Sequence, residues 1–142
     1  MGSLGVGNYK YKPVPDWAKL PSELILGDVA GIAIDDRDRV YLFNRGKHPI
    51  VVLSQTGEVI STWGEGVFSN PHGASIGPDQ CIYLTDNFDH TVRKFSLDGR
   101  LLLKIGIAGE SSGFMSGKPF CKCTHSAVSP TGDIFVSDGY QN

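Results

Sequence analysis

The chain has 142 residues, with 13 Lys and Arg against 15 Asp and Glu, and a formal net charge of −2. This near balance gives no electrostatic reason to expect nucleic acid or an anionic membrane as a partner. Hydrophobic residues make up 40% of the chain, enough for a folded core, yet no apolar run approaches the roughly 18 residues of a membrane span. The 18 Gly and 8 Pro favour short strands joined by tight turns over long helices.

The residues that follow Met1 contain no apolar stretch of signal-peptide length, so we expect no signal peptide within this chain and leave its compartment open. Residues 1–27 are expected to form a separate N-terminal segment, and the stretch 8–29 could supply an outer strand that closes the last blade of a propeller. Cys121 and Cys123 lie two positions apart, which matches neither a redox pair nor a zinc knuckle. We therefore expect three free thiols.

An internal repeat is the strongest feature of the sequence. The segments 30–44, 72–86 and 124–138 align, each with a small or polar first residue, an apolar strand, a polar turn and a second apolar strand that ends in Asn or Asp. Their starts lie 42 and then 52 residues apart. The first spacing fits a propeller blade of about 40–45 residues. The ten extra residues of the second spacing fall in the Gly- and Ser-rich stretch 106–123, which we expect to be a surface loop.

Two further strands follow each of the first two pairs. They are predicted at 49–54 and 59–64, and again at 91–96 and 101–106, with turns that contain Thr-Gly and Asp-Gly. Each unit is then a four-stranded antiparallel meander, in which the first two strands are covered on both faces and the outer pair alternates between apolar and polar residues. The alternative is a β-sandwich or barrel with accidental similarity, which is less favoured because three strand pairs in register are hard to obtain by chance.

The predicted fold is thus all-β, a partial β-propeller of about two and a half blades. Blade one is expected at 28–71, blade two at 72–123 and half of blade three at 124–142. Two and a half blades cannot close a ring and leave unpaired strand edges. We expect the ring to be closed by a second copy in a homodimer, or by missing blades of a longer chain.

Three motifs narrow the comparison: FNRGKHP at 43–49, NPHGASI at 70–76 and VSDGYQN at 136–142. With the repeat, they resemble NHL repeats and, more closely, the peptidyl-α-hydroxyglycine α-amidating lyase group and its bacterial relatives. The resemblance implies a six-bladed propeller that cleaves the C–N bond of a peptidyl-α-hydroxyglycine to give a peptide amide and glyoxylate. It also implies a zinc ion held by three His, a structural calcium ion in the channel, and a Tyr and an Arg that serve the chemistry.

Topology alone places three candidate residues on one face. In an antiparallel blade, the loop after the second strand and the loop that leads into the first strand emerge at the same end, so Arg45, His72 and Tyr140 should share a rim near the channel mouth. The resemblance assigns Arg45 to the substrate carboxylate, His72 to zinc and Tyr140 to proton abstraction. It assigns the backbone carbonyls of Ile32 and Ala74 to calcium.

Each assignment has a structural alternative. His72 could cap a strand, Arg45 could form a salt bridge with Asp86 or Asp89, and Tyr140 could be an aromatic lid on the core.

The positions that align with His72 are Ala30 and Thr124, which have no imidazole, so the chain alone lacks two of the three family zinc ligands. The remaining polar residues of these loops are expected to be structural: His48 and His90 at one repeat position, His125 in a local contact, and Asp138 in its turn.

Two functions from different classes stay open. The first is a metal-dependent lyase, or a fragment or relative of one, whose partner is a peptide or small molecule at the channel mouth. The second is a non-catalytic NHL propeller that binds a protein or small ligand with its top-face loops. A third interpretation, RNA binding through the basic residues Arg93, Lys94, Arg100 and Lys104, is weaker because such a cluster usually forms a solvated outer edge. We therefore expect neither a nucleic acid nor a membrane partner.

Overall fold

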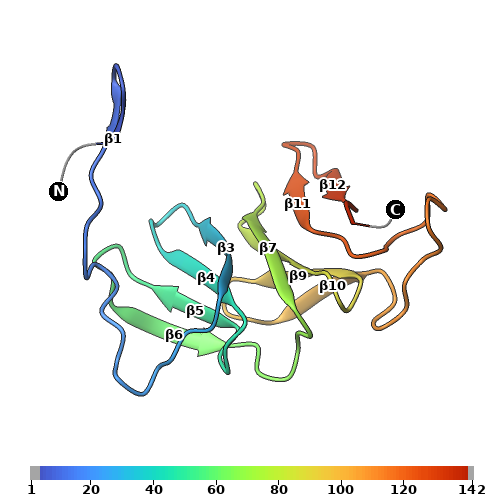
Figure 1. Ribbon diagram of the computed structural model, residues 1–142, viewed down its shortest axis with the longest axis horizontal. Coiled ribbons are helices and arrows are strands. Elements are labelled where there is room, and N and C mark those ends of the chain that lie inside the picture. Colours follow the sequence, from blue (N-terminus) through green and yellow to red (C-terminus); the bar gives the residue numbers. More distant parts are fainter. Residues whose placement is uncertain (1–3, 141–142) are drawn as a thin grey trace.

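The computed structural model describes residues 4–140, in which it contains twelve β-strands and no helix (Figure 1). Residues 141 and 142, the end of the third motif, lie outside this described part. The strands are β1 (Leu4–Val6), β2 (Tyr9–Tyr11), β3 (Val29–Ile34), β4 (Val40–Asn44), β5 (Ile50–Leu53), β6 (Val59–Trp63), β7 (Pro71–Ile76), β8 (Cys81–Asp86), β9 (Thr91–Ser96), β10 (Leu101–Ile105), β11 (His125–Val128) and β12 (Ile134–Ser137).

The sheets confirm the predicted blades. β3–β6 form one four-stranded antiparallel meander, β7–β10 form a second, and β11 and β12 pair as the first half of a third. The first strands of the three units are neighbours, with β7 between β3 and β11 (Figure 1). This radial arrangement of sheets around their first strands is a partial propeller and excludes the sandwich alternative.

Glycine permits the close approach of neighbouring first strands. A Cβ on Gly31 would lie 2.9 Å from the backbone nitrogen of Ala74, and a Cβ on Gly73 would lie 2.5 Å from the carbonyl oxygen of Thr124. Gly31 and Gly73 hold the same position in their repeats, immediately after the first residue. The repeat therefore has glycine, which carries no side chain, at the position where one blade contacts the next.

The core lies mainly between blades one and two. Tyr41, Phe43 and Ile50 of the first blade are completely buried in a cluster with Ile82 and Leu84 of the second. The other face of blade one is covered by the N-terminal segment, whose residues Trp17, Leu20, Leu24 and Leu26 pack on Leu42, Val51 and Leu53.

The N-terminal hairpin stands apart from this packing. Among the described residues, β1 and β2 pair only with each other, and their side chains are exposed (Figure 1). The segment touches the outer edge of blade one, where the Lys19 N–H donates to the Gly57 carbonyl at 2.8 Å. A role as the closing strand of the last blade stays a prediction.

The expected alternation of the outer strand pair is wrong. All four residues of β5 are buried, and in β9 Thr91, Val92, Arg93 and Phe95 are buried, whereas β10 is exposed along most of its length. Arg93 tolerates burial because it pairs with Asp89 and donates to the Val67 carbonyl at 2.9 Å. The third strand is therefore an interior strand, and the fourth alone forms the blade's outer edge.

The basic residues expected at this outer edge are partly neutralised. Lys94 lies 2.7 Å from an Asp79 carboxylate oxygen, and Arg93 is the buried partner of Asp89. The stretch 106–123 is mostly exposed, as predicted for a loop, and all three cysteines are free. In the described part of the chain, nothing has the length and apolar character of a membrane-spanning helix.

Candidate functional site

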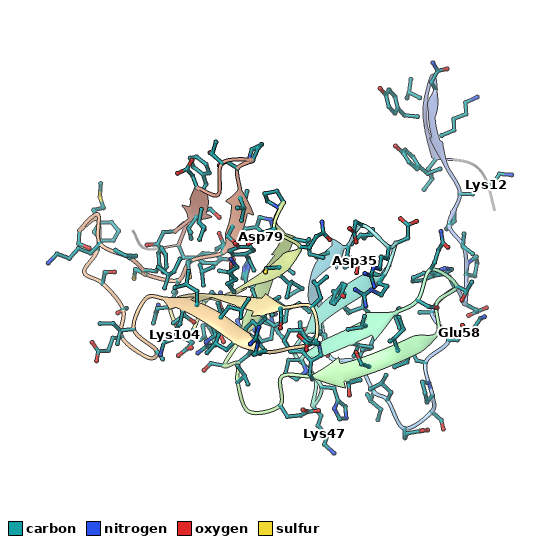
Figure 2. All side chains as sticks on the ribbon, turned by 180° about the vertical axis from the view of Figure 1, so that it is seen from behind. Lys12, Asp35, Lys47, Glu58, Asp79 and Lys104 are labelled. Carbon is teal, nitrogen blue, oxygen red and sulfur yellow. The ribbon has the colours of Figure 1, made fainter. Side chains whose placement is uncertain are left out.

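Arg45, His72 and Tyr140 lie at the same end of the blades, as the topology predicts. The His72 Nε2 atom is 3.3 Å from the Tyr140 hydroxyl, and the Arg45 Nε–H donates to the carbonyl of Pro71 at 3.1 Å. Figure 2 shows Lys47, which follows Arg45 by two residues in the sequence, at the lower edge of the molecule, well away from Asp35 and Asp79, which come from the turns inside the first strand pairs. The rim is thus assembled as expected, while the chemical roles of its residues stay predictions.

A repeated polar anchor builds this rim. The Asn or Asp at the end of each second strand, or directly after it in blade three, accepts a hydrogen bond from the N–H three positions before the repeat begins: Asn44 from Gly27, Asp86 from Ser69, and Asp138 from Cys121. These bonds tie the segment that leads into each first strand to the end of the second. In blade two the anchored segment is the one that carries His72.

The two nitrogen atoms of His72 have different partners. Nδ1 lies 2.8 Å from the carbonyl oxygen of Thr124 in the next blade, a group that can only accept. In the neutral imidazole, Nδ1 therefore carries the proton, and Nε2 offers its lone pair toward Tyr140. The ring of Tyr140 stands edge-on to the imidazole, with centroids 5.9 Å apart.

Arg45 does not form the alternative salt bridge that the sequence suggested. Its ion-pair partner is Asp28, whose carboxylate oxygen lies 3.6 Å from Nη1 and is largely exposed. Asp86 instead accepts backbone N–H groups, and Asp89 is bound to Arg93. The guanidinium therefore lies at the surface of the rim with one weak ion pair.

The carbonyls assigned to calcium lie at the inner edge of the sheets. The Asp35 N–H donates to the Arg39 carbonyl at 3.1 Å, which closes the β3–β4 hairpin. Because hydrogen-bonded pairs alternate along an antiparallel ladder, the carbonyl of Ile32 points away from β4, toward the free inner edge. In blade two, the Gly77 N–H donates to the Cys81 carbonyl at 3.0 Å. The same alternation along β7 therefore directs the Ala74 carbonyl away from β8, toward the inner edge.

The donors for zinc are a poorer match. Within residues 4–140, no three side chains of His, Cys, Asp or Glu converge where they could hold a metal ion. His48 pairs with Glu65, and the Nδ1 of His90 accepts the Lys122 N–H at 3.0 Å, so both serve loop structure as expected. Burial raises the pKa of the Cys123 thiol to about 12, so it stays protonated at neutral pH.

The sequence analysis missed a pocket beside Tyr140. It has a volume of about 270 Å³ and is lined by Asn87, Phe88, Lys122 and Tyr140. The repeat carried a signal for it, because Phe88 and Tyr140 occupy the same repeat position, two residues after the anchoring Asp. An aromatic residue at that position in two successive blades marks the loops that line the pocket.

Known proteins resemble this chain in sequence. No model of a protein family matches it. The chain is 42% identical over 90 residues to peptidyl-alpha-hydroxyglycine alpha-amidating lyase 1 of Drosophila melanogaster, covering 61% of this chain and 16% of that protein. It is 32% identical over 154 residues to peptidyl-glycine alpha-amidating monooxygenase B of Xenopus laevis, covering 89% and 17%. It is also 32% identical over 133 residues to NHL repeat-containing protein 3 of Homo sapiens, covering 87% and 38%. The chain thus spans well under half of each of these relatives.

Solved structures share the fold at low sequence identity. Virginiamycin B lyase from Staphylococcus aureus aligns with a TM-score of 0.57 and 14% identity over 77% of this chain and 34% of that one. A protein of unknown function from Bacteroides caccae aligns with a TM-score of 0.53 and 18% identity over 84% of this chain and 40% of that one. The chain is therefore a partial β-propeller of NHL-type blades that resembles the peptidyl-α-hydroxyglycine α-amidating lyase group.

Proposed function

We propose that the chain is a part or a relative of a lyase that cleaves the C–N bond of a peptidyl-α-hydroxyglycine. One observation carries the proposal: His72 and Tyr140 are in contact on the rim to which Arg45 is also fixed. This combines a proton acceptor with a cation, which is what the reaction of an α-hydroxy acid derivative requires. The names of the amidating relatives supply the reaction class.

The reaction needs one proton removed and one delivered. The hydroxyl of the substrate loses its proton to a base, its oxygen forms a C=O bond, and the C–N electron pair goes to the amide nitrogen. The nitrogen then takes up a proton, so the products are a peptide amide and glyoxylate. Tyr140 would accept the hydroxyl proton as its own phenolic proton passes to Nε2 of His72, 3.3 Å away.

Arg45 would bind the substrate carboxylate. A guanidinium pairs with a carboxylate through two parallel N–H donors, and the Nε bond to Pro71 fixes its plane beside His72. The weak contact with the exposed Asp28 is one that a substrate carboxylate could replace. Arg45 would thus place the reacting carbon next to the base.

The described residues suit the two metals that the resemblance implies to different degrees. Three-imidazole zinc binding does not fit the described residues, because His72 has no converging second and third ligand, so no step is assigned to zinc. Calcium fits better, since it binds hard oxygen ligands such as the inner-edge carbonyls of Ile32 and Ala74. When bound there, it would neutralise the carbonyl dipoles that meet at the inner edge and so tie neighbouring first strands together.

Glyoxylate release from a peptidyl-α-hydroxyglycine tests the proposal. The chain should release glyoxylate above the uncatalysed background, and Tyr140→Phe should lower kcat/KM by at least about 100-fold, the lower range of a lost general base. Tyr9→Phe, in the exposed N-terminal hairpin, is the matched control and should leave the rate unchanged. No turnover by the parent chain, or equal turnover by Tyr140→Phe, would refute the lyase.

A second candidate, a non-catalytic propeller that binds a peptide or small ligand on this rim, is favoured by the absence of a three-ligand metal cluster in the described chain. Titration with an unreactive peptidylglycine separates the two functions. Binding that depends on Arg45, with no glyoxylate from the hydroxylated peptide, would support the binding module.

We also propose that the ring is completed by a second copy, or by further blades. Apolar side chains are exposed at both ends of the stack, namely Ile32 and Ile34 on blade one and Phe135 on blade three. Packing such surfaces together is the general way in which propeller blades bury their faces. Light scattering that finds a well-folded monomer at all concentrations would exclude closure by a second copy.

A further inference from the structure

The pocket beside Tyr140 is built from the loops of two blades. Asn87 and Phe88 belong to the β8–β9 loop of blade two, and Lys122 precedes β11 of blade three. In the sheet order, the β8–β9 loop is farther from the inner edge than β7, which carries His72. The pocket therefore extends outward from the contact between His72 and Tyr140.

The walls of the pocket are held in place before any ligand arrives. The N–H groups of Phe88 and Asp89 both donate to Asp86 Oδ1, at 3.1 and 3.0 Å. The side chain of Asn87 accepts a hydrogen bond from Asn70 at 2.6 Å. The Lys122 N–H donates to His90 Nδ1 at 3.0 Å. Fixed walls lower the entropic cost of binding a side chain.

Inside this frame, the aromatic rings that face a ligand are exposed. The side chain of Phe88 is 59% exposed and that of Tyr140 is 60% exposed, although both line the pocket. No carboxylate of the described residues forms an ion pair with the Lys122 ammonium. Exposed aromatic rings beside a free cation suit a ligand with an apolar body and a hydrogen-bond acceptor.

We propose that this pocket is the subsite for the residue that precedes the hydroxyglycine, and that Phe88 selects aromatic or large apolar side chains there. This rests on the proposed function, because Tyr140 is shared by the pocket and the reacting centre. The volume of about 270 Å³ is below that of pockets for whole drug-sized ligands and suits one side chain. Lys122 donates to the backbone carbonyl of that same residue, a contact available to every peptide.

Binding of unreactive peptides tests the subsite without requiring turnover. The full chain is titrated calorimetrically with N-acetyl-Phe-Gly and with N-acetyl-Gly-Gly, which lack the hydroxyl group of the substrate. We expect the Phe peptide to bind about tenfold more tightly, as for partial burial of one aromatic side chain. Phe88→Ala should reduce this ratio to about two or less. Phe114→Ala, at a more exposed Phe in the 106–123 loop, should leave it unchanged.

Lys122→Met separates the two contacts. This substitution should lower the affinity for both peptides by a similar factor, about fivefold, because the lysine binds only the peptide backbone. The ratio of the two affinities should be preserved. Equal affinities for the two peptides, no binding of either, or a ratio that survives Phe88→Ala would overturn the subsite.

The lyase and the subsite fail separately. Glyoxylate release with no side-chain preference would refute the subsite and keep the lyase. A side-chain preference in binding with no release of glyoxylate would refute the lyase and keep the subsite.

Discussion

The polar anchors at the ends of the second strands can be tested by an isosteric exchange. Asn44 and Asp86 hold the same repeat position but have different partners. The Asn44 amide donates to the carbonyls of His48 and Pro49, at 2.8 and 3.3 Å. The Asp86 carboxylate accepts four backbone N–H groups and donates nothing. Asp86→Asn and Asn44→Asp change neither volume nor backbone preference appreciably, so each isolates the hydrogen-bond pattern.

The expected cost follows from the partners that are lost. In Asp86→Asn, an amide NH₂ replaces one acceptor oxygen and leaves a backbone N–H without a partner in a fully buried site. Such a loss costs about 1.5–3 kcal/mol, and removal of the buried charge returns part of its desolvation energy, so we expect about 1.5 kcal/mol. In Asn44→Asp, a carboxylate oxygen faces two carbonyl oxygens, and we expect about 2 kcal/mol or more.

Urea unfolding measures both changes. With a slope of about 2 kcal/mol/M, the midpoint should fall by about 0.7 M for Asp86→Asn and by about 1 M for Asn44→Asp, at an unchanged slope. If either variant unfolds within about 0.2 M of the parent, the hydrogen-bond geometry that distinguishes the two anchors contributes nothing, and the reasoning fails.

Three further predictions follow from packing and charge. Gly31→Ala places a Cβ 2.9 Å from the Ala74 nitrogen and should destabilise the fold by about 1–3 kcal/mol, whereas Gly113→Ala, whose nearest atom is 3.9 Å away, should be neutral in the same urea titration. Thr85→Val removes a buried hydroxyl that has no partner among the described residues and should stabilise by about 1 kcal/mol; a destabilised variant would show that the hydroxyl is satisfied. Burial raises the pKa of Asp35, but hydrogen bonds and charge from Arg39 outweigh it, so the net pKa is lowered. Its stabilising contribution is then full above about pH 4 and lost as the pH falls through the lowered value, and Asp35→Asn should flatten the acid side of the stability profile.

The sequence was sufficient to predict the blades because their register repeats. The turn in each first hairpin, the apolar strands and the terminal Asn or Asp recur in three segments, and the structure confirms each of these strand pairs. Since antiparallel connections fix which loops share an end, the common rim of Arg45, His72 and Tyr140 could also be predicted. What the repeat specifies is the backbone, and the strand pairs that it predicts are the ones observed.

Predictions failed where a side chain forms an ion pair that the local sequence pattern does not indicate. Alternating residues in 91–96 suggested a half-exposed strand, but Asp89 supplies a buried partner for Arg93, so β9 is interior. The structural alternative for Arg45 named Asp86 or Asp89 as its ion-pair partner, but the partner is Asp28, in a segment that precedes the first repeat. Nothing in the local pattern identifies such a partner, because ion pairing depends on distances that only the packed blades determine.

In each repeat, the residue that anchors the loop and the residue that faces the rim occupy different, nearby positions. The anchoring position always holds a short side chain with a carbonyl or carboxylate oxygen, because in all three blades it must accept a backbone N–H. Two positions later the blades differ: blade one has Gly46, where a Cβ would lie 2.6 Å from Asn44 Oδ1, and the next two blades have Phe88 and Tyr140. The loop that is fixed by Asp86 therefore presents an exposed side chain, that of Phe88. This explains how one rim can carry the proposed base in one blade and an apolar contact in the next.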